Sequence, residues 1–78
     1  MALLTKKQAL RAVETACNQI LTDDLGIEGK LLMFDNFSIS LAAWVSANLI
    51  DYEWLNELLN YVNDVKQMYR RSLKKEGR

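Results

Sequence analysis

Apolar residues near the start of the chain recur at steps of three and four: Leu10, Val13, Cys17 and Ile20. This spacing is typical of one face of an α-helix. Thr5, followed three positions later by Gln8, has the form of a capping box, in which each side chain satisfies a free backbone donor at the helix start. Asp23 and Asp24 would lie unfavourably at the negative end of the helix dipole. The pattern therefore predicts an amphipathic helix from Thr5 to about Leu21.

The next segment has two interpretations. Residues 30–34 form an apolar run of strand length, and residues 37–40 alternate between apolar and polar, so the two could pair as a short β-hairpin. A helix that starts at Asn36 or Ser38, both good capping residues, and continues to about Ile50 explains the same residues. The pattern alone does not separate these alternatives.

The segment from Leu41 to Ile50 has only Ser46 and Asn48 as polar residues, so it is apolar on all sides. A helix of this kind is typically buried, and we expect this segment to be the most buried part of the fold. The uncharged run from Phe37 to Ile50 is shorter than the ~20 apolar residues that span a bilayer. No membrane segment is predicted.

The last helix has the clearest pattern. Asp51 is a suitable cap, and no helix breaker follows before about Leu73. Its apolar residues cover an arc of roughly 200° on a helical wheel, which is wider than the roughly 100° that one core contact requires. The wide arc predicts either two covering elements in the same chain or a second chain.

These elements predict a mainly α fold, a small three-helix domain with a long C-terminal helix and, as the alternative noted above, a short β-hairpin between the first two helices. The chain contains no proline, and Gly26 and Gly29 are the only internal helix breakers. A chain of 78 residues can bury only enough surface for one hydrophobic core, so residues 1–78 are expected to form a single domain. Residues 74–78 are expected to be a frayed basic tail.

Few residues of the chain are suited to chemistry. It contains no histidine, and its only cysteine, Cys17, lies on the apolar stripe of the first helix. Nucleophilic pairs such as Ser-His or Cys-His are excluded, and no zinc site can be built from one cysteine. We therefore expect no catalytic residues, no cofactor and no metal. One free cysteine and no secretory signal predict a cytoplasmic protein, and a chain this short favours oligomerisation as the additional source of stability.

Charge is sorted along the chain although the net charge is zero. Residues 12–65 contain nine acidic residues and only Lys30 as a base, whereas residues 66–78 contain six basic residues and one acid. The chain is therefore expected to have an acidic body and a basic C-terminal end.

One edge of the last helix carries Trp54, Tyr61 and Met68 at intervals of seven residues. Aromatic and methionine side chains are enriched at protein interfaces, so this edge is predicted to contact a protein partner, either a second copy or a foreign protein. The opposite side carries amides that could hydrogen-bond to a partner: Asn56, Asn60, Asn63 and Gln67.

The basic end supports the alternative, a small nucleic-acid-binding regulatory protein. Its candidate contacts are Lys66, Arg70, Arg71, Lys74 and Lys75. The same charges also complement the helix dipole without any ligand, and the acids beside the amides would repel phosphate. The prediction is therefore a non-catalytic protein-interaction module that self-associates through its C-terminal helix. It would act as an adaptor, inhibitor or accessory protein, for example of a phage or mobile element.

Overall fold

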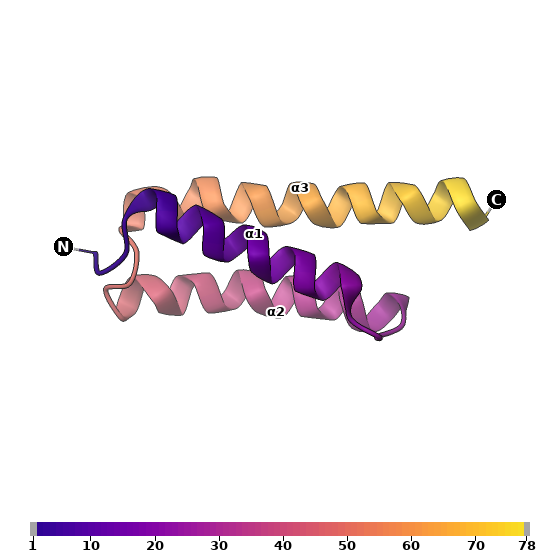
Figure 1. Cartoon of the computed structure of the whole chain (residues 1–78), viewed down its shortest axis with the longest axis horizontal. Helices are drawn as coiled ribbons and strands as arrows, with labels where there is room; N and C mark the ends of the chain where they lie inside the picture. Colours follow the sequence, from indigo (N-terminus) through magenta and orange to yellow (C-terminus); the bar gives the residue numbers. More distant parts are fainter. Residues whose placement is uncertain (1, 78) are drawn as a thin grey trace.

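The computed structural model describes the backbone of residues 2–77 and the side chains of residues 2–74. Three helices account for most of the chain: α1 (Lys6–Thr22), α2 (Ile27–Ser46) and α3 (Tyr52–Gly77). α1 and α3 run in the same direction, and α2 runs antiparallel to both (Figure 1). Each helix packs against the other two, and the bundle measures 47 × 18 × 16 Å. The mainly α, three-helix prediction is confirmed.

α1 begins as predicted. The Thr5 side chain accepts a hydrogen bond from the Gln8 backbone, and the Gln8 side chain accepts one from the Thr5 backbone, at 3.1 and 3.0 Å. This reciprocal cap satisfies two donors that would otherwise have no partner. The helix ends at Thr22, with Asp23 in an extended conformation as its C-cap. The predicted stripe faces inward, because Val13, Cys17 and Ile20 are all buried.

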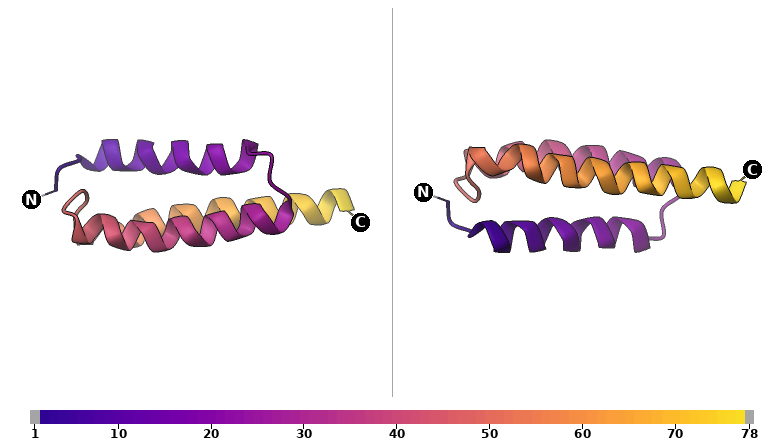
Figure 2. Two further views of the ribbon diagram at one scale, coloured as in Figure 1. Left: turned by 90° about the horizontal axis from the view of Figure 1, so that it is seen from below. Right: turned by 90° about the horizontal axis from the view of Figure 1, so that it is seen from above.

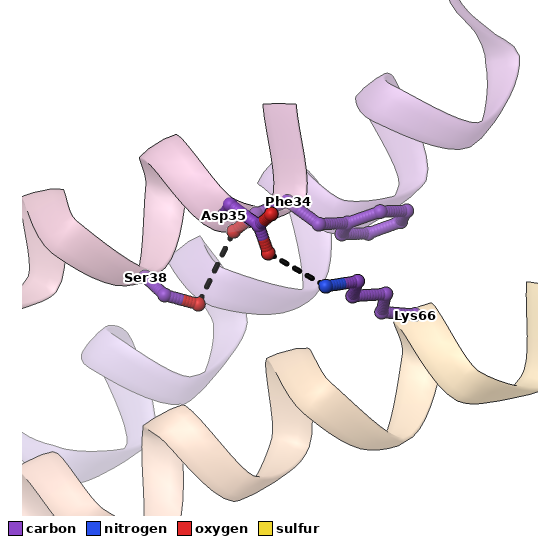
Figure 3. A network of polar contacts seen from close by, with 4 residues as sticks. All are labelled: Phe34, Asp35, Ser38 and Lys66. Atoms are coloured by element: carbon purple, nitrogen blue, oxygen red, sulfur yellow. Dashed lines mark hydrogen bonds and ion pairs between the residues drawn. The ribbon is translucent and has the colours of Figure 1, made fainter. Parts of the chain in front are cut away.

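The prediction of a β-hairpin over residues 30–40 is wrong, and so is the alternative helix start at Asn36 or Ser38. α2 begins at Ile27, directly after Gly26, and runs through the whole segment. Ser38 is accommodated in the helix because its hydroxyl donates to the Phe34 carbonyl, one turn earlier, at 3.1 Å (Figure 3). No residue of the described part forms a strand.

The alternation over residues 37–40 has a helical explanation. In a strand, Phe37 and Ile39 would share one face, whereas in a helix they lie about 200° apart. Phe37 turns inward and meets Trp44 edge to face, with 5.7 Å between ring centroids. Ile39 turns outward and is 71% exposed. Residue 39 therefore contributes nothing to the core that residue 37 helps to build.

The expectation that residues 41–50 are the most buried segment is also wrong. Within it only Leu41 and Ile50 are buried, and most of the residues between them are exposed. α2 ends at Ser46 and not near Ile50. The chain then turns through Asn48, which has a φ of 62°, and the Asn48 carbonyl accepts a hydrogen bond of 2.7 Å from the Leu3 backbone.

α3 begins at Tyr52 and continues past Leu73, the predicted end, to Gly77. Its C-terminal turns extend beyond the ends of the other two helices (Figures 1 and 2). Residues 74–78 are the tail that was predicted to fray. The side chains of residues 75–77 and the whole of residue 78 lie outside the described part, so fraying stays a prediction.

The core lies between the three helices. Its largest fully buried side chains come from α2, α3 and the connecting loop, and smaller ones from α1: Phe34, Leu41, Ile50, Leu58, Val62, Val13 and Cys17. No polar or charged residue of the described part is buried. The bundle is therefore held together mainly by apolar burial.

Candidate interaction surfaces

The residues predicted to form the contact edge of α3 have different surroundings. Trp54 and Tyr61 are half-buried and pack against the core, whereas Met68 is 64% exposed. Part of the wide apolar arc of α3 is therefore covered by its own chain. That this edge binds a partner stays a prediction.

Tyr61 and Met68 line a hollow of about 490 Å³ between α1 and α3. α1 contributes Asn18 and Leu21, and α3 contributes the remaining side chains of the wall: Tyr61, Asp64, Val65, Met68, Tyr69 and Ser72. The wall is mostly apolar, with Asp64 as its only charged residue. Two of the three residues of the predicted edge, Tyr61 and Met68, thus lie on one side of a concave surface near the C-terminal end of α1.

Tyr61 stands close to α1. Burial raises the pKa of its hydroxyl above the usual value, and the negative charges of the Glu14 carboxylate and the Cys17 thiolate raise it further. Burial likewise raises the pKa of the Cys17 thiol. A thiol of this kind is a poor nucleophile at neutral pH, so Cys17 acts as a small core residue.

The predicted amide row lies on the outside of α3. Asn56, Asn60 and Asn63 are exposed, and Gln67 is half-buried. These side chains are accessible to a partner.

The basic residues of α3 do not form one group. Lys66 is only 21% exposed at its side chain and forms an ion pair with Asp35, with 2.7 Å between Nζ and Oδ1 (Figure 3). Arg70, Arg71 and Lys74 are exposed. The side chain of Lys75 lies outside the described residues. Lys66 therefore ties α3 to α2, whereas Arg70, Arg71 and Lys74 face solvent.

A second exposed surface lies on α2 and was not predicted. Leu32, Asn36, Ile39 and Ala43 are all exposed and follow one another at steps of four, three and four, so they share one side of the helix. We call these four residues the α2 outer face. Leu32 is 60% exposed and Ile39 71% exposed.

None of the four residues of the α2 outer face is charged, and the charges nearest to it on α2 are Glu28 and Asp35, one turn before Leu32 and Ile39 respectively. α2 contains only Glu28, Lys30 and Asp35 as charged residues. The Lys30 ammonium donates to the Leu21 carbonyl at 2.7 Å and lies 5.6 Å from the centroid of the Tyr69 ring, so it is directed into the bundle. From Asn36 to Ile50 the chain has no charge at all.

The exposed sides of the other two helices differ from this face. α1 exposes Lys7, Arg11 and Glu14, and α3 exposes charges along its length: Glu53, Glu57, Asp64, Arg70, Arg71 and Lys74. Depletion of charge is what distinguishes the core of a protein interface from ordinary surface. The sequence signal for this face was the same apolar character around α2 that led to the wrong prediction of burial.

Comparison of the chain with protein-family models, curated proteins and solved structures finds no match. No helix in the described part is both long enough and apolar enough to cross a membrane. The same residues contain no group of three or more acidic or cysteine side chains placed to hold a metal ion.

Proposed function

We propose that the chain is a non-catalytic protein-interaction module that binds an apolar surface of another protein through the α2 outer face. The observation that carries this proposal is the exposure of Leu32 and Ile39 on the helix with the fewest charges. Large apolar side chains grouped on a surface with few charges gain free energy when a partner removes them from water. The partner surface is expected to be apolar, because a charge placed against this face would lose its hydration without gaining a counter-charge.

The non-catalytic part of the proposal rests on the side chains that the chain offers. It has no histidine, and its one thiol is buried with a raised pKa. A module of this kind would act as an adaptor, an inhibitor or an accessory subunit.

The experiment introduces a photo-crosslinking residue at position 39 of the tagged chain in its native cells, with position 15 on the exposed side of α1 as the control. A protein crosslinked from position 39 only is then purified and titrated with the chain by calorimetry at several temperatures. Binding with a negative heat-capacity change, abolished by Ile39→Lys and kept by Thr15→Lys, is the expected result. Equal loss with both variants, or no specific crosslink at position 39, would rule out this surface.

A second candidate, binding of nucleic acid, is favoured by one observation. Arg70, Arg71 and Lys74 are exposed near the C-terminal end of α3. If they bind phosphates, replacing all three with glutamate abolishes binding to a DNA or RNA duplex, and binding of the unmodified chain weakens steeply with salt. Failure of the unmodified chain to bind either duplex at low salt eliminates this candidate.

A further inference from the structure

Three exposed residues of α3 form a stripe in which an acid, an apolar residue and a base follow one another: Asp64, Met68 and Arg71. Their steps of four and three place them on one side of the helix. Along α3 the stripe begins with the acid Asp64 and ends with the base Arg71, so an antiparallel copy presents the base opposite the acid. It is therefore complementary to a copy of itself that runs antiparallel.

Asp64 and Met68 also line the hollow between α1 and α3. Met68 is 64% exposed at its rim. Methionine is a flexible apolar side chain that adapts to an irregular wall. A methionine from another molecule, entering beside the resident one, would contact Tyr61 and Val65. This contact would remove apolar surface of both molecules from water.

We propose that a second copy of this chain docks antiparallel on this stripe, about a two-fold axis between Gln67 and Met68. In this register the Met68 side chains meet on the axis over the two hollows, and Asp64 of each copy lies opposite Arg71 of the other. A two-fold contact needs only one self-complementary patch, which this stripe provides. The inference is independent of the α2 outer face, which takes no part in the contact.

Charge favours a second copy as the occupant. The two ion pairs inside each chain, Lys6 with Glu57 and Lys66 with Asp35, do not involve the stripe, and among the described side chains neither Asp64 nor Arg71 forms an ion pair. In the antiparallel register the two Asp64 residues stand about 10 Å apart along the helix axis, so like charges do not meet. The net charge of zero removes long-range repulsion between copies.

The contact is short, so we expect weak association, with a dissociation constant in the range of roughly 1–100 μM. Sedimentation equilibrium of the full chain over a concentration series measures it. Asp64→Arg alone and Arg71→Asp alone each place like charges opposite one another and are expected to weaken the dimer about tenfold or more. The double variant restores opposite charges, and its dissociation constant is expected to return to within about threefold of the original.

Arg70→Asp is the matched control, because it makes the same change of charge one residue away, on a side of α3 about 100° from the stripe. It is expected to leave the dimer unchanged. Far-ultraviolet circular dichroism checks that each variant keeps its helices. A second measurement uses Met68→Cys in a Cys17→Ala background, which should form a disulfide between copies on mild oxidation, whereas Arg70→Cys in the same background should not.

A chain that stays monomeric up to about 1 mM overturns the proposal. So does a dimer that the single stripe variants leave intact, or one that Ile39→Lys dissociates. Neither result decides the proposed function, because binding of a foreign protein through the α2 outer face is measured separately by crosslinking at position 39.

Discussion

Lys66 Nζ of α3 lies 2.7 Å from Asp35 Oδ1 of α2, and this ion pair joins residues 31 positions apart in the chain. Its lysine is mostly covered, at 21% exposed, although Asp35 is 58% exposed, whereas Lys6 and Glu57 of the other ion pair are 52% and 56% exposed. Solvent screens an exposed pair more strongly than a covered one. We therefore expect the pair between α2 and α3 to be the more stabilising of the two.

Lys66→Met removes this interaction and keeps most of the apolar length of the side chain. We expect it to lower the free energy of unfolding by about 0.5–1 kcal/mol, and Lys6→Met to lower it by less than about 0.5 kcal/mol. Urea unfolding followed by circular dichroism measures both. Equal losses would show that coverage by the neighbouring helices does not strengthen the pair.

Phe34 is fully buried, whereas Ile39 on the same helix is 71% exposed. Phe34→Ala leaves a cavity and is expected to cost about 3–5 kcal/mol, a large part of the stability of a small domain. Ile39→Ala is expected to change stability by no more than about 0.5 kcal/mol. Thermal and urea unfolding of dilute samples compares them. A large loss with Ile39→Ala would mean that this side chain belongs to the core.

Asn48 turns the chain between α2 and α3 with a φ of 62°, in the left-handed region. Asparagine and glycine tolerate this region better than other residues. Asn48→Ala is expected to cost about 1 kcal/mol and to lower the melting temperature by about 4–8 °C. Asn48→Gly should keep the melting temperature within a few degrees, because glycine adopts this φ without strain. Equal melting temperatures for the Asn48→Ala and Asn48→Gly variants would show that the turn is not strained.

Burial raises the pKa of the Cys17 thiol above its usual value of 9.0. The folded chain therefore keeps this proton at a pH where the unfolded chain has lost it. The stabilising contribution is complete below pH 9.0 and is lost as pH rises toward the folded pKa. Tyr61 acts in the same direction above its own usual pKa of 10.0.

Comparing the chain with Cys17→Ala isolates the thiol. Between about pH 9 and pH 10 the free energy of unfolding of the original chain should fall more steeply than that of the variant. Urea unfolding at several pH values gives both slopes. Parallel curves would mean that the thiol has the same pKa in the folded and unfolded chains.

The start and inward stripe of α1 could be predicted because they depend on neighbours in the sequence. The bonds between Thr5 and Gln8 span three residues, and the buried Val13, Cys17 and Ile20 recur at the period of the helix itself. The edge of α3 could be found as a sequence pattern, but its exposure could not, because Trp54 and Tyr61 pack against the core whereas Met68 stays exposed. How much of each side chain remains accessible depends on where a separate helix packs.

α2 shows what only the tertiary structure decided. Its sequence is apolar around the whole helix, so no period indicates which side faces inward, and short apolar stretches within it resemble strands. Packing against α1 and α3 selects the side with Phe34 and Leu41 for the core and leaves Leu32 and Ile39 in solvent. The sequence by itself determined three things: the helical class, the first helix cap and the sorting of charge. Which apolar residues remain available to a partner was decided by the packing of the three helices, because two neighbours can cover only part of the circumference of a third.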